Sequence, residues 1–75
     1  MIRLSELARN ERCRVVKLFA QGKMRLRLHS FGVFEGEEIR AVRKSVLGDP
    51  TMYQIDTTYV ALRYEEAFLI GVERI

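Results

Sequence analysis

The side chains that could do chemistry in this sequence are few and scattered. His29 is the only histidine and Cys13 is the only cysteine. A zinc site, a cysteine–histidine nucleophilic pair or a serine–histidine–aspartate triad would each need His29. No CxxC or HxxH spacing suggests that it meets other ligands. We therefore expect Cys13 to be a structural thiol and His29 a surface imidazole.

Acidic residues occur in two adjacent pairs, Glu37–Glu38 and Glu65–Glu66. Consecutive residues on a strand point to opposite faces, so the members of a pair are poorly placed to share a general acid–base site. We expect both pairs to be solvated. The sequence also lacks the GxxxxGK[ST] and GxGxxG motifs that bind nucleotide phosphates. It therefore predicts no catalytic residue, no cofactor, no metal site and no enzymatic activity.

Length and charge favour one small domain that binds something. The chain has 75 residues, which is room for a single hydrophobic core, so we assign residues 1–75 to one domain. Its net charge of +3 is unevenly distributed. Residues 1–30 carry a balance of +6 and residues 31–75 a balance of −3. Such a polarised chain favours an acidic protein surface, a phosphate backbone or anionic lipid as its partner.

The sequence predicts a cytoplasmic location. Its longest apolar run, Ala67–Val72, is far shorter than the roughly 20 residues needed to cross a bilayer. The first residues include Arg3 and Glu6 and contain no apolar stretch typical of a signal peptide. A lone cysteine does not suit a secreted domain of this size. We expect no direct insertion into a membrane.

Hydrophobic patterning predicts a mostly β fold. β-branched and apolar runs indicate about five strands, at residues 13–19, 38–44, 52–56, 59–64 and 69–72. Single helical turns are expected at residues 4–7, capped by Ser5, and at 65–67. A turn is expected at residues 47–50. Open sheet edges promote aggregation, and a set of about five short strands therefore favours a small, partly closed barrel.

One amphipathic helix is predicted over residues 23–31. Met24, Leu28 and Phe31 share a face that should be buried, and Gly32 should end the helix. Leu26 lies on the opposite face between Arg25 and Arg27. A single exposed leucine often has no function. The other interpretation is an apolar knob with a basic rim, which is typical of the centre of an interface.

The order of these features resembles the ferrous iron transport protein A family (FeoA) over nearly the whole chain. Leu4-Ser5-Glu6-Leu7 is similar to the family's opening LxEL, and Leu47-Gly48-Asp49-Pro50 to its LGDP loop. Ala61-Leu62-Arg63 followed by Glu65-Glu66-Ala67 resembles its ALR-x-EEA block. The sequence departs from the family pattern at Leu26 and His29, where an arginine and an apolar residue are usual, and at Thr57, where the hairpin usually has glycine.

The resemblance implies an SH3-like β-barrel that binds rather than catalyses. It implies a small cytosolic accessory protein for ferrous iron uptake, whose partner is the cytoplasmic part of the membrane transporter FeoB. The predicted partner-binding residues come from the helix and from the LGDP loop: Arg25, Leu26, Arg27, His29, Leu47, Gly48, Asp49 and Pro50.

Two other functions stay open on the sequence. The isoelectric point near 9.4 permits a nucleic-acid-binding barrel. However, single-strand binders interleave aromatic and basic residues, and the tyrosines lie outside the basic half of this chain, so we expect no nucleic-acid partner. A weak metal-binding or metal-sensing protein would have to rely on a single histidine. The sequence does not specify the oligomeric state.

Overall fold

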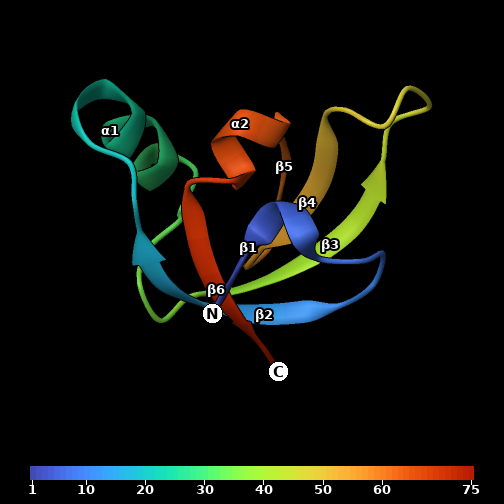
Figure 1. Cartoon of the computed structure of the whole chain (residues 1–75), viewed down its shortest axis with the longest axis horizontal. Coiled ribbons are helices and arrows are strands. Elements are labelled where there is room, and N and C mark those ends of the chain that lie inside the picture. Colours follow the sequence, from blue (N-terminus) through green and yellow to red (C-terminus); the bar gives the residue numbers. More distant parts are fainter.

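A computed structural model describes all 75 residues as a six-stranded antiparallel sheet with helical segments at one end (Figure 1). The elements in chain order are β1 (Ile2–Arg3), the 3-10 helix η1 (Leu4–Glu6), β2 (Arg12–Leu18), α1 (Gly22–Ser30), β3 (Glu38–Lys44), β4 (Thr51–Ile55), β5 (Thr58–Leu62), α2 (Tyr64–Ala67) and β6 (Ile70–Arg74). The longest helix, α1, has nine residues, and no helix is long and apolar enough to cross a membrane.

The strands lie in the order β1-β6-β2-β3-β4-β5. The register shifts in the β2–β6 pair near Val15 and Lys17 and in the β3–β4 pair near Ala41 and Arg43. Such bulges bend strands, which curves the sheet around its core. The mostly β class is confirmed, with one strand more than predicted. The missed strand, β1, is only two residues long and forms by pairing with β6 at the far end of the chain.

The core fills the inside of the curved sheet. Alternate residues of the strands point inward, as expected for strands with one solvent-exposed face. Leu28 is the fully buried residue of α1, and Met24 and Phe31 pack against the core beside it. The predicted buried stripe of the helix is therefore confirmed. Gly32 follows with φ of +90°, a conformation suited to glycine that ends the helix as predicted.

The two short helical turns differ in detail from their prediction. Ser5 does not cap the first turn: η1 begins after Arg3, whose backbone N–H donates to Oε2 of Glu6 at 2.8 Å. The β1–β6 pairing holds Arg3 in an extended conformation, and this sets the start of the turn. The Ser5 hydroxyl is buried without a hydrogen-bond partner. The second turn, α2, begins at Tyr64, one residue earlier than predicted.

Two loops have the geometry that their residues suggest. In the loop between β3 and β4, Gly48 has φ of +88°, and the Ser45 N–H donates to the Pro50 carbonyl at 2.9 Å. The β4–β5 hairpin turns through Asp56 and Thr57, and the positive φ of +55° falls on Asp56. The turn therefore forms without a glycine, because an aspartate tolerates this left-handed conformation.

Figure 1 shows how these parts are placed in space. The helices α1 and α2 and the loop of residues 45–50 lie along one end of the barrel. Both chain termini lie at the opposite end, where β1 and β6 run side by side.

Candidate protein-binding edge

Helix α2 joins the two segments that the sequence singled out. Nε of Arg27 on α1 lies 2.7 Å from Oε2 of Glu66 on α2. At the other end of α2, the backbone N–H of Tyr64 donates to Oδ1 of Asp49 at 2.9 Å. We call the surface formed by α1, α2 and residues 45–50 the helical edge. These contacts hold its three parts together although they are far apart in the sequence.

Glu66 is the central polar residue of the helical edge. It is 7% exposed, so the expectation that both acidic pairs are solvated is wrong for this residue. Its Oε1 accepts the backbone N–H of Arg63 at 3.0 Å while Oε2 accepts from Arg27. Burial alone would raise the pKa of Glu66, but the Arg63 N–H and the Arg27 guanidinium together hold this pKa below its ordinary value. The carboxylate therefore stays charged and keeps α1 and α2 together.

The helical edge exposes apolar side chains. Leu26 on α1 is 70% exposed and Leu47 in the loop is 92% exposed, so the outward position predicted for Leu26 is confirmed. The sequence did not point to three further exposed residues, Val46 and Tyr64 within this edge and Phe68 directly after α2. Val46 adjoins the predicted loop, and the two aromatic residues flank the EEA block, so this proximity was the available signal.

The other predicted residues lie in the same edge but have different surroundings. Arg25 is half-buried and makes no ion pair, whereas Arg27 pairs with Glu66 and lies over the Phe31 ring at 4.9 Å. His29 is half-buried and stacks on Phe34 with ring centroids 4.7 Å apart.

In the loop, Gly48, Asp49 and Pro50 shape the turn and attach it to α2. Among the four residues predicted from the loop, Leu47 is therefore the one whose side chain is left free for a partner, and its neighbour Val46 is exposed beside it.

A stack of aromatic and cationic groups extends the helical edge toward the start of the chain. The Tyr64 and Phe68 rings are stacked with centroids 5.9 Å apart. The Arg3 guanidinium lies 4.6 Å from the Phe68 centroid and 3.9 Å from that of Phe19, and it donates to the Phe68 carbonyl at 2.6 Å. A cation–π contact at an exposed site is worth about 0.5–1 kcal/mol. Phe68, which directly follows α2, therefore contacts both the Tyr64 ring and the Arg3 guanidinium.

No group of three His, Cys, Asp or Glu side chains converges to hold a metal ion. Cys13 is buried in β2, and this burial raises the pKa of its thiol to about 11. The thiol is therefore protonated at neutral pH, which is unfavourable for metal ligation or nucleophilic attack.

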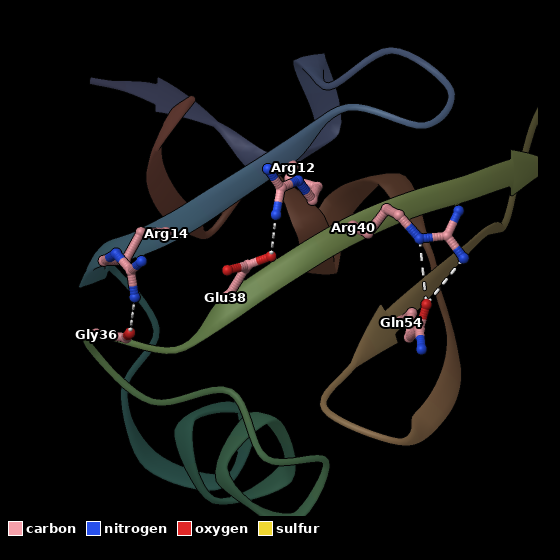
Figure 2. A network of polar contacts seen from close by, with 6 residues as sticks. All are labelled: Arg12, Arg14, Gly36, Glu38, Arg40 and Gln54. Atoms are coloured by element: carbon pink, nitrogen blue, oxygen red, sulfur yellow. Dashed lines mark hydrogen bonds and ion pairs between the residues drawn. The ribbon is translucent and has the colours of Figure 1, made fainter. Parts of the chain in front are cut away.

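A polar network covers the outer face of β2, β3 and β4 (Figure 2). Arg12 pairs with Glu38 at 3.1 Å, and Arg40 donates through Nε and Nη2 to Oε1 of Gln54 at 3.1 and 2.8 Å. A hollow of about 420 Å³ beside them has no hydrophobic lining, being formed by Arg12, Glu37, Glu38, Arg40, Gln54 and Asp56. Arg12–Glu38 is the one ion pair among the lining residues, and none of them is hydrophobic, so this hollow lacks the apolar anchors that the helical edge presents.

Comparison with known proteins identifies the fold and the family. A family model described as the FeoA domain matches residues 2–74. The chain belongs to the FeoA family. The solved structure of FeoA from Stenotrophomonas maltophilia in complex with zinc, described as a procaryotic SH3 domain protein, superposes with a TM-score of 0.80 at 35% identity, over 97% of this chain and 91% of that one. The FeoA resemblance and the SH3-like barrel are thereby confirmed.

Two curated relatives give the family context. A putative Fe(2+) transport protein A of Campylobacter jejuni is 32% identical, over 96% of this chain and 97% of its own length. An Fe(2+) transport protein A/Fe(2+) transporter FeoB fusion protein of Porphyromonas gingivalis is 36% identical over 99% of this chain. This chain spans only 9% of the fusion protein's length, so it corresponds to a small part of that molecule.

Proposed function

We propose that this chain is a cytoplasmic accessory protein for Fe²⁺ transport that binds the cytoplasmic part of a FeoB transporter through its helical edge. Membership of the FeoA family supports the role in iron transport. The fusion relative supports the choice of partner, because it carries a FeoA segment and a FeoB transporter in one polypeptide. The proposed role is binding rather than catalysis, and it involves neither nucleic acid nor insertion into the bilayer.

The observation that carries this proposal is the exposure of Leu26 and Leu47 on segments that α2 holds together. Hot spots of interfaces are apolar anchors that become desolvated at the centre of a contact. Burying one leucine side chain fully is worth about 1.5–3 kcal/mol. The Glu66 and Asp49 contacts connect these segments before binding, which lowers the conformational entropy lost when the edge docks.

Charge adds direction to the contact. Lys23 and Arg25 lie beside Leu26 on α1 and make no ion pair. Cationic groups around an apolar anchor speed association with an acidic surface and add modest affinity, and salt screens them. The partner surface should therefore be partly apolar and acidic, and the complex should weaken as salt is raised.

The proposal is tested by co-purification of the chain with FeoB expressed alongside it, at low and at high salt. We expect Leu26→Asp to abolish capture while changing the free energy of unfolding by no more than about 0.5 kcal/mol, because Leu26 is a surface residue. Ile75→Asp is the matched control, since Ile75 is an exposed aliphatic residue outside the helical edge. Capture of Leu26→Asp at the wild-type level would contradict the proposal, as would equal loss in both variants.

A further inference from the structure

The free edge of β5 carries unused backbone groups. β5 lies at the end of the sheet and pairs only with β4. The β4–β5 hairpin closes at the pair Ile55↔Thr58, and in a two-residue hairpin this closing pair is hydrogen-bonded. Hydrogen-bonded and non-hydrogen-bonded pairs alternate along an antiparallel ladder, so the backbone N–H and C=O groups of Val60 and Leu62 also point toward β4. The N–H and C=O groups of Tyr59 and Ala61 therefore point outward, and no hydrogen bond joins them to another part of the chain.

This edge lacks the usual protection against pairing. Sheet edges in soluble proteins are commonly blocked by charged residues, proline or a bulge. The residues of β5, Thr58–Leu62, include neither a charge nor a proline. The β4–β5 register is also regular, whereas the β2–β6 and β3–β4 pairs each contain an irregularity. The strand is a ready template for another strand.

We propose that β5 pairs in antiparallel fashion with β5 of a second copy of this chain, about a two-fold axis at Val60. In that register Tyr59 of each copy lies opposite Ala61 of the other. Their outward N–H and C=O groups then form about four backbone hydrogen bonds, and the two sheets become one continuous sheet. This inference does not rest on the proposed transport function.

The outer-face side chains of β5 fit this register. Tyr59 and Ala61 share the outer face because alternate residues of a strand point the same way, and Tyr59 is 58% exposed. Beside Ala61 lies a hollow of about 140 Å³ that Pro50 and Met52 also line. The Tyr59 ring of the second copy would lie over this hollow, a large side chain opposite a small one.

The charges that flank β5 suit a second copy in particular. Asp56 precedes the strand and Arg63 follows it, and both are exposed. In this register Arg63 of one copy lies opposite Thr57 of the other, one position along the chain from Asp56, at both ends of the new ladder. Because β5 itself is uncharged, the symmetric pairing brings no like charges together within the strand. An unrelated strand would need to match both the charge pattern and the hollow.

Hydrogen exchange of the wild-type chain tests the pairing directly. We expect sedimentation equilibrium to show a monomer–dimer equilibrium as the concentration rises from micromolar to millimolar. Over the same range the amides of Tyr59 and Ala61 should pass from fast exchange to protection in proportion to the dimer fraction. A chain that stays monomeric at millimolar concentration would overturn the proposal. A dimer in which these two amides still exchange freely would overturn it as well.

A pair of variants separates edge pairing from folding. Ala61→Lys places a charge on the outer face beside the hollow, and we expect the association constant to fall on the order of tenfold or more. Tyr59→Phe keeps the ring and removes only the hydroxyl, so it should dimerise within about twofold of wild type. Thermal denaturation checks that each variant is folded. Folded Ala61→Lys protein that dimerises as well as wild type would refute the assignment.

Discussion

Replacing Glu66 by alanine should loosen the helical edge by an amount that the structure allows us to estimate. The variant loses the hydrogen bond from the Arg63 N–H at the start of α2, and such caps are worth about 1 kcal/mol. It also loses the 2.7 Å contact with Arg27. A hydrogen bond between charged groups contributes about 1.5–3 kcal/mol, but the Arg27 side chain is 52% exposed, so solvent screening favours a value near or below the lower limit.

We therefore expect Glu66→Ala to lower the free energy of unfolding by about 2 kcal/mol, which corresponds to a decrease in Tm of about 10 °C for a chain of this size. Glu66→Gln keeps an oxygen to accept the Arg63 N–H and loses only the charge, so it should cost less. Urea denaturation followed by circular dichroism measures both variants. A double-mutant cycle with Arg27→Ala isolates the ion pair, for which we expect a coupling of about 1 kcal/mol.

The dependence on pH gives an independent check of the same contact. Because the pKa of Glu66 is lowered in the folded chain, its contribution is present above its unfolded pKa and is lost as the pH falls through the folded value. Wild type should thus lose more stability than Glu66→Gln between about pH 5 and pH 2, because this interval extends from the ordinary glutamate pKa to lower values. A Glu66→Ala chain that unfolds at the wild-type temperature, with no coupling to Arg27, would refute the reasoning.

Three further outcomes follow from burial. Leu28→Ala should cost about 2–5 kcal/mol in urea denaturation because Leu28 is fully buried, and a loss below 1 kcal/mol would contradict the assigned core. The Cys13 thiol, with its pKa raised by burial to about 11, should react with a thiol reagent at pH 8 about a hundredfold more slowly in the folded chain than in urea. Burial also raises the pKa of Tyr53 to about 12. The contribution of the neutral Tyr53 phenol to stability should therefore be full below about pH 10 and be lost as the pH rises through 12. The absorbance of the phenolate follows this titration.

The sequence predicts most of the fold because most of it is encoded locally. The alternation in β2 and β3, the stripe of α1 and the stop at Gly32 are all visible within windows of a few residues. β1 escaped prediction because its two residues become a strand only by pairing with β6, at the other end of the chain.

Less of the candidate site could be predicted from the sequence, because its contacts also join segments that are far apart in the chain. Leu26 and Leu47 could be singled out from their neighbours along the chain. The burial of Glu66 could not, because it depends on Arg27 approaching from another helix. The free edge of β5 likewise depends on the strand order, which no local pattern specifies. Resemblance to a family supplied the barrel type, and the physical contacts that hold the helical edge together had to come from the structure.

The placement of both termini at the end of the barrel opposite the helical edge has a consequence for how such a domain can be tethered. A linker leaving either end points away from α1, α2 and residues 45–50, so covalent attachment need not cover the surface that we propose for docking. Attachment turns a bimolecular encounter into an intramolecular one, with an effective concentration of about a millimolar for a short flexible linker. A contact with a Kd below about a millimolar is then occupied most of the time, even where free molecules at lower concentration would rarely associate.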